Sequence, residues 1–466
     1  MSKQLNRCRR FLQRMRVSAV LFFALLFWMT YGMRKVAAQA SPANPNVIFI
    51  LADDMGWGDI SRFGCTDYVT TNMDRIATQG MTLTRACVWP VCSPSRAALL
   101  TGMDPKRVGV PAVLLPSSTS SISSNSYTIA EHLRRQGYAT ALIGKWHLGY
   151  SNNALPNARG FDTFFGFRGG QINYTNYYYS TEGTNDLWEN TTDVSADYMG
   201  QYCTRVFTQK ALDFVDANTN RPFFLFLSYN APHYPLARYE TNVVAQYNYI
   251  TNLNRRYFAA MVRAMDDGIG EVLTRLQQRG LTSNTLVWFM TDNGPMTNQG
   301  GDPAPFRGEK FLLLDGGIRV PALVQWPGNI PANSTNDAPF LITDVFPTLA
   351  AATGLPPPDS LRLDGSNQLA FLRGGAPPDN PQQVLFNDGN FNRRALITPD
   401  WKYINTNGTP ELYAMPYDVS ETTNQAASHS DLIAEFETAI TNRWQDILRG
   451  IYKTNDPPAL MRVRRQ

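Results

Sequence analysis

The sequence predicts an α/β protein in which a large, mostly parallel or mixed sheet is covered by helices on both faces. Short apolar runs recur with helical patterns between them, over residues 46–51, 139–143, 222–227 and 286–290. A run that is apolar at nearly every position is typical of a strand buried on both faces of a sheet. The chain has 466 residues, of which 43% are hydrophobic and 17% charged. This composition excludes collagen-like, coiled-coil and fully disordered proteins.

Two helices are predicted between these runs. Thr128, with Glu131 three residues later, forms a capping box, and Gly137 marks the end of that helix. Residues 257–279 carry apolar side chains at three- and four-residue spacing, the pattern of one helix face. Both helices therefore present an apolar face that can pack on a sheet.

A smaller unit is predicted near the C-terminus. The proline-rich stretch 354–381 is followed by strand-like pieces at 383–386, 394–397, 401–404 and 411–413, and by an amphipathic helix at 430–448. We expect a small antiparallel sheet plus a helix. The predicted organisation is a signal peptide over 1–40, a catalytic α/β domain over 41–380 and a C-terminal β-sheet subdomain with a terminal helix over 381–466.

An aromatic-rich insertion interrupts the α/β pattern between residues 152 and 197. It contains Tyr174, Tyr177, Tyr178, Tyr179 and Trp188. Long loops of this kind often carry substrate selectivity, so these rings are candidates for stacking on a sugar or an aryl group. The alternative is that they pack the insertion onto the body of the protein.

The first 40 residues have the features of an export signal. They hold eight of the 42 Lys and Arg residues and no Asp or Glu, so the remainder has 34 basic and 38 acidic residues, a net charge of −4. Such a body has no bulk attraction to nucleic acid or anionic membranes. The segment combines a basic start, an apolar run over 19–29 and a small-residue ending at Ala38-Gln39-Ala40. We expect export to a periplasmic, extracellular or lysosome-like compartment, with membrane anchoring only if this segment is not cleaved.

Cysteine content agrees only loosely with export. Four of the five cysteines follow the predicted signal, at Cys65, Cys87, Cys92 and Cys203. They allow two disulfides, or one if Cys92 has another role.

Acidic residues follow two of the predicted strands directly. Asp53 and Asp54 come after the first strand, and Asp292 and Asn293 come after the strand at 286–290. The carboxyl ends of strands in open α/β sheets form the functional crevice, where these two turns can meet. Three carboxylates and an amide oxygen suit Ca²⁺ or Mg²⁺ rather than zinc. The alternative is that Asp and Asn simply form turns.

The motif Cys92-Ser93-Pro94-Ser95-Arg96 precedes a short predicted helix over residues 97–101, with Gly102 after it. The positive end of the helix dipole favours an anionic or polarised group at Cys92. Arg96 supplies forked donors suited to a tetrahedral oxyanion. The alternative is a buried structural cysteine ahead of a helix.

Four further cationic or titratable residues lie at or near predicted strand ends or in rigid loops: Lys145, His147, His233 and Lys310. Singly, each would more often be a surface residue or a satisfied core residue. Together with the carboxylates and Cys92 they suit transfer from a sulfate or phosphate ester. Spacing alone does not separate sulfur from phosphorus.

These motifs resemble those of the type I sulfatases of the alkaline-phosphatase-like superfamily. Cys92-Ser93-Pro94-Ser95-Arg96 is similar to the family signature Cys-x-Pro-Ser-Arg, and residues 144–149 (Gly-Lys-Trp-His-Leu-Gly) match the second signature. The resemblance extends from about Pro45 to the last helix. Asp315 departs from the more usual Glu before the paired glycines, at a position not expected to touch the chemistry.

The resemblance implies that a separate maturing enzyme oxidises Cys92 to formylglycine, whose hydrate is the nucleophile. It implies a divalent cation, most often Ca²⁺ and otherwise Mg²⁺, held by Asp53, Asp54, Asp292, Asn293 and the modified Cys92. Arg96 and His147 are expected to support the hydrate. The residues expected to bind the sulfate group are Lys145, His233 and Lys310.

The expected reaction is hydrolysis of an aryl or carbohydrate sulfate ester, and no nucleic-acid partner is expected. Two alternatives stay open. One is a phosphodiesterase or phosphonate monoester hydrolase of the same superfamily. The other is a binding protein that keeps the fold without the catalysis.

Overall fold

A computed structural model describes residues 44–451, except 237–239, 359–360, 377–382 and 416. The predicted signal peptide lies outside the described residues. Within them, no helix is both long and apolar enough to cross a membrane.

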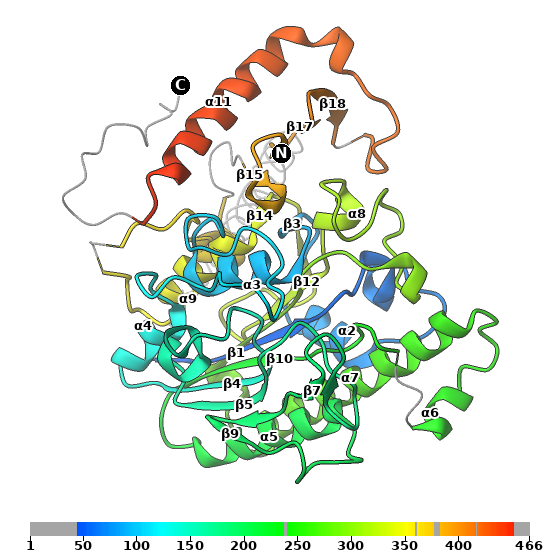
Figure 1. Cartoon of the computed structure of the whole chain (residues 1–466), viewed down its shortest axis with the longest axis vertical. Helices are drawn as coiled ribbons and strands as arrows, with labels where there is room; N and C mark the ends of the chain where they lie inside the picture. The colour runs from blue at the N-terminus through cyan, green and yellow to red at the C-terminus, as the bar shows by residue number, and fades with distance from the viewer. Residues whose placement is uncertain (1–43, 237–239, 359–360, 377–382, 416, 452–466) are drawn as a thin grey trace, which may run out of the picture. The chain divides into compact units, whose positions relative to one another are not determined.

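A ten-stranded mixed sheet forms the centre of the described chain (Figure 1). Its middle strands β11, β1, β10, β4 and β5 are parallel neighbours. The strands, in spatial order, are β13 (Ser334–Asn336), β2 (Met81–Leu83), β12 (Ala322–Gln325), β11 (Thr285–Thr291), β1 (Asn46–Ala52), β10 (Phe223–Ser228), β4 (Ala139–Lys145), β5 (Thr163–Phe167), β8 (Trp188–Glu189) and β9 (Thr192–Asp193). The four strands predicted from the apolar runs are confirmed, and they are four adjacent members of this parallel group.

Successive side chains of each central strand point to opposite faces of the sheet, and this creates two cores. In β1, Val47, Phe49 and Leu51 pack into one core, while Ile48 and Ile50 pack into the other, as expected when successive side chains point to opposite faces. Each core is closed by helices. One face carries α3 (Cys92–Thr101), α4 (Ile129–Arg135) and α9 (Val345–Ala352); the other carries α2 (Thr71–Thr78), α5 (Cys203–Ala217) and α7 (Leu253–Gln278).

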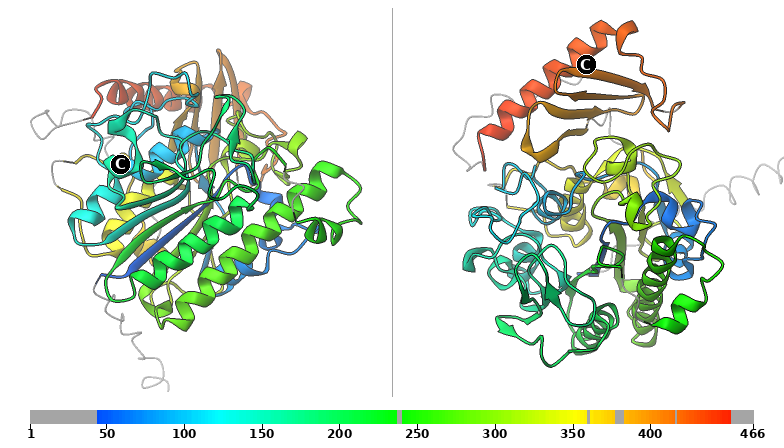
Figure 2. Two further views of the ribbon diagram at one scale, coloured as in Figure 1. Left: turned by 60° about the horizontal axis from the view of Figure 1, so that its bottom comes forward. Right: turned by 45° about the vertical axis from the view of Figure 1, so that its right-hand side comes forward.

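The helix ends explain where the predictions needed adjustment. The capping box of α4 is confirmed, since Thr128 and Glu131 bond each other's backbone N–H groups. Helix α7 begins at Leu253, four residues before the predicted start, because the Asn252 side chain accepts a hydrogen bond from the Arg255 N–H and caps it. Helices α5 and α7 lie side by side on the sheet (Figure 2).

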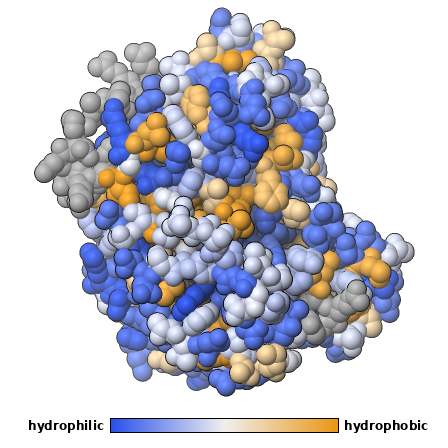
Figure 3. Space-filling view, viewed as in Figure 1, coloured by the Kyte–Doolittle hydropathy of each residue, from blue (hydrophilic) through white to orange (hydrophobic). Residues whose placement is uncertain are grey.

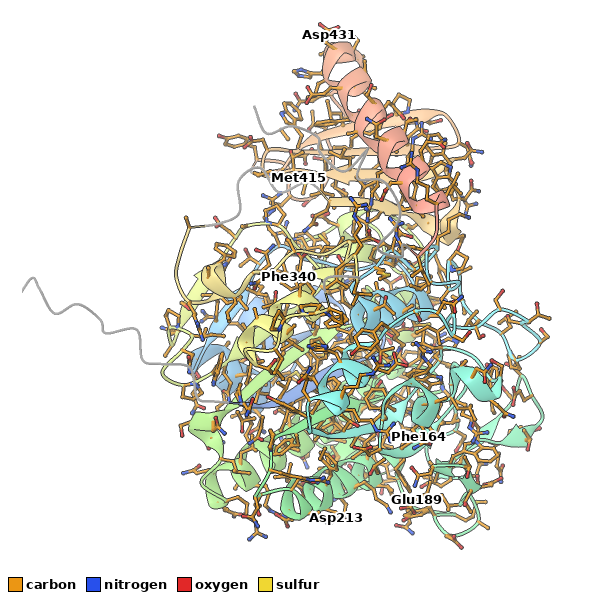
Figure 4. All side chains as sticks on the ribbon, turned by 90° about the vertical axis from the view of Figure 1, so that its left-hand side faces the viewer. Phe164, Glu189, Asp213, Phe340, Met415 and Asp431 are labelled. Atoms are coloured by element: carbon orange, nitrogen blue, oxygen red, sulfur yellow. The ribbon has the colours of Figure 1, made fainter. Side chains whose placement is uncertain are left out.

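A four-stranded antiparallel sheet follows, as predicted. It consists of β15 (Gln383–Phe386), β16 (Arg393–Ile397), β17 (Trp401–Thr406) and β18 (Thr409–Ala414). Helix α11 (Ser430–Leu448) lies against this sheet (Figure 2). Its Phe436 and Ile440 belong to a third core, which it forms with the sheet. Met415, labelled in Figure 4, follows β18 and joins the first core.

The remaining elements are short. Two further strand pairs are β3 (Ala86–Cys87) with β14 (Phe340–Leu341), and β6 (Tyr178–Tyr179) with β7 (Thr184–Asn185). The short helices are α6 (Thr241–Ala245), α8 (Asp315–Ile318) and α10 (Leu369–Leu372). The surface seen in Figure 3 is mainly hydrophilic, in keeping with the burial of most apolar side chains in the three cores.

The aromatic insertion packs onto the body. Tyr174, Tyr177 and Tyr179 are buried, and the Tyr177 hydroxyl donates to the Gln201 carbonyl at 2.8 Å. The expectation that these three rings stack on substrate is therefore wrong, and the packing alternative holds for them. Tyr178 is exposed, and the guanidinium of Arg168 lies 3.6 Å from the centre of the Trp188 ring.

The described residues form no disulfide bond. All four described cysteines are free, and Cys87, Cys92 and Cys203 are buried. Neither bridge allowed by the sequence is formed.

Candidate active site

The predicted site residues meet at the carboxyl edge of the parallel strands. Backbone hydrogen bonds join the turns that carry them: the Asp53 N–H donates to the Ala231 carbonyl at 3.2 Å, and the Asp292 N–H donates to the Ala52 carbonyl at 3.1 Å. Strands β10 and β11 flank β1 on its two sides. The register of three adjacent strands therefore brings the two acidic turns and the His233 loop together.

Each of the first two carboxylates is paired with a buried lysine. Lys145 Nζ donates to Asp53 Oδ2 at 2.6 Å, and Lys310 Nζ donates to Asp54 Oδ1 at 2.6 Å. Asn293 Nδ2 also donates to Asp54 Oδ1 at 2.7 Å. Burial opposes ionisation of Asp54, but the charge of Lys310 and these hydrogen bonds outweigh it and lower its pKa. Asp54 is thus ionised, beside fixed positive charge.

Arg96 lies beneath this cluster and is fully buried. Its Nε and Nη2 lie 2.9 and 2.7 Å from Asp292 Oδ2, and its Nη1 donates to Ser228 Oγ at 2.6 Å. Nε and Nη1 donate to protein groups, whereas Nη2 contacts Asp292 as an ion pair without forming a hydrogen bond among the described residues. Arg96 therefore holds Asp292 in place and compensates its charge.

Cys92 is the first residue of α3, so the helix begins earlier than predicted. Its Sγ lies 3.3 Å from His147 Nδ1. His147 Nε2 lies 2.9 Å from the Leu114 carbonyl, which can only accept. Because Nε2 must carry the proton for that bond, Nδ1 of the neutral ring presents a lone pair to Cys92.

His147 reaches this position by leaving the strand. If the strand continued past Lys145, Lys145 and His147 would project from one face, but β4 ends at Lys145 and His147 has a φ of 59°. Both side chains still enter the site, from a turn rather than a strand. Burial, reinforced by the charge of Lys145, lowers the pKa of His147 well below its usual value, so the ring is neutral.

The segment that carries Lys310 is held against the acidic turn by close backbone contact. The Gly294 N–H donates to the Gly317 carbonyl at 2.9 Å. A Cβ at Gly294 would lie 1.9 Å from the Gly316 carbonyl oxygen, so only glycine fits there. Further along, the departure at Asp315 is accommodated by ion pairs with Lys402 and Arg319, at 2.5 and 3.2 Å, away from the carboxylates of the site.

The residues present fit a divalent cation. Asp53 Oδ1 and Asn293 Oδ1 are buried and have no hydrogen-bond partner among the described residues. Ligand atoms of Asp53, Asp54 and His233 lie within 4.8 Å of one another. Burial and the adjacent charge of Asp53 raise the pKa of Asp292 to about 6, a penalty that a cation would relieve. Buried, oxygen-rich donors of this kind suit Ca²⁺ or Mg²⁺.

His233 lies beside the acidic cluster. Its Nε2 is 3.5 Å from Asp54 Oδ2, and its Nδ1 is 2.6 Å from the Tyr234 carbonyl. Burial, with the charges of Lys310 and Lys145, lowers its pKa to about 4 despite Asp54. A neutral ring with Nδ1 protonated directs the Nε2 lone pair toward the acidic cluster.

Three groups around the site were not anticipated. Ser228 Oγ bonds Arg96 and the Lys145 carbonyl, the Leu114 carbonyl orients His147, and the Tyr174 hydroxyl donates to the carbonyls of Asn230 and His233. Ser228 was detectable as a polar residue at the end of a parallel strand. The Leu114 carbonyl had no sequence signal, because every residue carries one.

Comparisons with known proteins find sulfatases among the relatives of this chain. A family model described as Sulfatase matches residues 45–355. N-acetylgalactosamine-6-sulfatase of Canis lupus familiaris is 33% identical over 372 residues, covering 74% of this chain and 69% of that protein. Arylsulfatase G of Mus musculus is 31% identical over 415 residues, covering 78% and 73%.

Solved structures are also similar to this chain in fold. Ps i-CgsB in complex with k-i-k-neocarrahexaose matches with a TM-score of 0.79 at 32% identity, covering 85% of this chain and 93% of that one. A phosphonate monoester hydrolase of Agrobacterium radiobacter has a TM-score of 0.61 at 19% identity over 88% of this chain and all of that one, which shows a shared fold alone. The chain belongs to the sulfatase family, as a type I sulfatase of the alkaline-phosphatase-like superfamily.

Proposed function

We propose that this sulfatase removes sulfate from a carbohydrate sulfate ester by way of a formylglycine made from Cys92, with a divalent cation at the acidic cluster. The proposal rests on one observation, that Cys92 and the oxygens suited to a cation lie at the same edge of the sheet. Cys92 opens α3 with its Sγ 3.3 Å from the free lone pair of His147 Nδ1. On the same carboxyl edge lie two buried oxygens, of Asp53 and Asn293, that lack hydrogen-bond partners among the described residues.

The thiol itself is poorly suited to be the nucleophile. Burial raises the pKa of Cys92 in spite of the nearby charges of Lys145 and Lys310. A protonated thiol attacks weakly, which favours conversion of Cys92 by a maturing enzyme over a thiolate mechanism. The hydrate of the resulting aldehyde would supply the attacking oxygen.

Other residues of the chain accept the proton, bind the sulfate oxygens and hold the cation. His147 Nδ1 accepts a proton from the group at position 92, and the Leu114 carbonyl keeps the ring in the tautomer that allows this. Lys145 and Lys310 supply positive charge for the sulfate oxygens, and Arg96 holds Asp292 from below. Asp53, Asp54, Asp292 and Asn293 would hold Ca²⁺ or Mg²⁺, which would polarise the sulfate group.

We favour a carbohydrate as the leaving group because relatives of this chain are named for carbohydrate substrates or ligands. Those named above include an N-acetylgalactosamine-6-sulfatase and a protein crystallised with a neocarrahexaose. An aryl sulfate ester is the second substrate class, with which a carbohydrate sulfate should be compared. We also propose that the protein is exported through its N-terminal segment, and that this segment anchors it to a membrane only if it stays uncleaved.

The test is the mass of the tryptic peptide 86–96 from active protein isolated from its native host. Fragment ions distinguish Cys87 from Cys92. We expect Cys92 to have lost sulfur and gained oxygen, as aldehyde or hydrate. A thiol at Cys92 in an active preparation would overturn the mechanism, and faster turnover of a phosphate diester than of any sulfate ester would favour the phosphodiesterase alternative.

A further inference from the structure

Phe311 has an unusual backbone conformation beside a residue of the site. Its φ is 77°, in the left-handed region, where a bulky side chain is rare and strained. It follows Lys310 directly, and the Lys310 ammonium lies 5.7 Å from the centre of the Phe311 ring. Half of the side chain is exposed to solvent (50%). A strained, solvent-facing phenyl ring therefore stands next to the lysine that pairs with Asp54.

The main chain of Phe311, rather than its ring, is what the surrounding structure holds. The Phe311 N–H donates to the Pro90 carbonyl at 2.8 Å, and Asn387 Nδ2 donates to the Phe311 carbonyl at 2.7 Å. Pro90 lies two residues before Cys92, and Asn387 directly follows β15 of the C-terminal sheet. Glycine would adopt this conformation without strain and keep both hydrogen bonds. Folding therefore does not explain the phenyl ring.

Two other exposed apolar side chains also adjoin residues of the site. Leu115 (53% exposed) follows the residue whose carbonyl orients His147, and Tyr234 (50% exposed) follows His233. Of the three, Phe311 is the one whose ring contacts a charged group of the site among the described residues, with the Lys310 ammonium 5.7 Å from the ring centre. A substrate whose sulfate reaches Lys310 therefore brings its alcohol portion within reach of the Phe311 ring.

We propose that Phe311 is a specificity-determining residue, whose ring is the platform for a six-membered ring in the leaving alcohol. This inference rests on the proposed function, and it adds the chemistry that is recognised beyond the sulfate. A phenyl face offers a flat apolar surface to the C–H face of a pyranose or to an aryl ring, and it gives little to a small alkyl group.

Asn387 acts through Phe311 as a positioning residue. It is buried and contributes one hydrogen bond to the strained main chain. The C-terminal sheet, which supplies none of the charged groups of the site, would in this way take part in substrate selection.

The experiment measures binding, so that it does not depend on turnover. Cys92→Ala protein, with and without Phe311→Gly, is titrated calorimetrically with galactose 6-sulfate, 4-nitrophenyl sulfate and methyl sulfate. We expect Phe311→Gly to weaken binding of the two ring-bearing esters about tenfold and to leave methyl sulfate unchanged. The sugar and aryl arms show which kind of ring the platform prefers.

Matched variants isolate the role of the ring. Phe311→Tyr keeps a ring and should bind as the parent does, while Asn387→Ala should reduce the preference for ring-bearing esters by a smaller factor. Tyr417→Ala, which removes an aromatic ring that is 91% exposed, is the control expected to change nothing. Phe311→Gly relieves the strained φ, so its melting temperature should equal or exceed that of the parent.

Two results would overturn the inference: equal affinities in the parent and Phe311→Gly for both ring-bearing esters, or equal weakening of all three ligands. The second would mean that the substitution acts through Lys310 and not through the ring. Failure of the proposed function appears separately, as absence of sulfate release by protein whose Cys92 carries the modification.

Discussion

Arg96 and Asp292 form a buried ion pair in which two guanidinium nitrogens, Nε at 2.9 Å and Nη2 at 2.7 Å, contact the same carboxylate oxygen. Neither side chain is exposed to solvent. The pair joins the first turns of α3 to the end of β11. Arg96, the arginine of the cysteine motif, therefore holds Asp292 in its position within the acidic cluster.

Replacing Arg96 with methionine should destabilise the protein by about 3–5 kcal/mol, because a buried carboxylate then lacks its partner. Denaturant unfolding measures this effect. The loss should be larger in chelator than in Ca²⁺, since a bound cation compensates part of the negative charge. Adding Asp292→Asn should recover part of the stability, and a variant as stable as the wild type in chelator would contradict the role given to Arg96.

Cation binding should stabilise the folded protein. A cation at about 100 times its dissociation constant contributes about 2.7 kcal/mol, so Ca²⁺ should raise the melting temperature and chelator should reverse the change. Asn293→Ala removes one free buried oxygen and should reduce this response, whereas Asp197→Asn, at an exposed carboxylate, should not. An undiminished response in Asn293→Ala would show that the cation binds elsewhere.

His147 should lose its catalytic contribution on replacement by alanine, with kcat falling roughly 10²- to 10⁴-fold. The structure makes a second prediction about its protonation. Nitrogen NMR at neutral pH should find the proton on Nε2, because the Leu114 carbonyl accepts a hydrogen bond from it. A proton on Nδ1 would remove the proposed base.

Asp266 should make stability depend on pH. It accepts hydrogen bonds from the Met73 N–H at 2.8 Å and the Asn72 N–H at 3.1 Å, but burial outweighs these bonds and raises its pKa to about 6 from 3.8. Because the folded state holds the proton more tightly than the unfolded state, this group's contribution to stability falls as the pH rises from about 4 to about 6, then stays level. The integrated change is about 2–3 kcal/mol.

Asp266→Asn keeps an acceptor without a titrating charge, so the wild type should lose stability relative to this variant across that pH range. Urea unfolding at pH 4, 5, 6 and 7 gives the difference. Asp213→Asn, at an exposed position, serves as the control. A constant difference between wild type and Asp266→Asn would show that Asp266 ionises at its ordinary pKa.

Much of the fold was predictable from local pattern. The central strands are apolar at most positions because both of their faces are buried, and this is visible in residues 47–51 alone. The capping box at Thr128 and the span of α11 are likewise local. The early start of α7 was missed because it depends on the side chain of Asn252, which precedes the apolar pattern. Helix α3 begins at Cys92, without a side-chain cap and before its apolar residues.

The insertion and the arginine show where local reasoning failed. Tyr177 has the sequence setting of a surface ring in a polar loop, yet it is buried in the second core and its hydroxyl donates to the Gln201 carbonyl. The forked donors of Arg96 suit an oxyanion or a carboxylate equally well, and the partner is chosen by β11, which lies almost 200 residues further along the chain. Phe311 carried no sequence signal, because its φ is imposed by Pro90 and Asn387.

The sequence by itself determined which chemical groups are present and in what local setting: a cysteine before a helix, acidic turns after strands, and lysines and histidines near strand ends. Only the tertiary structure decided which of them pair, which nitrogen of His147 carries its proton and which oxygens are left for a cation. These properties depend on burial and on distances between residues far apart in the chain. Desolvation strengthens each contact in the closed interior, so the packing of four parallel strands, α3 and the Lys310 loop brings common residue types together as a candidate active site.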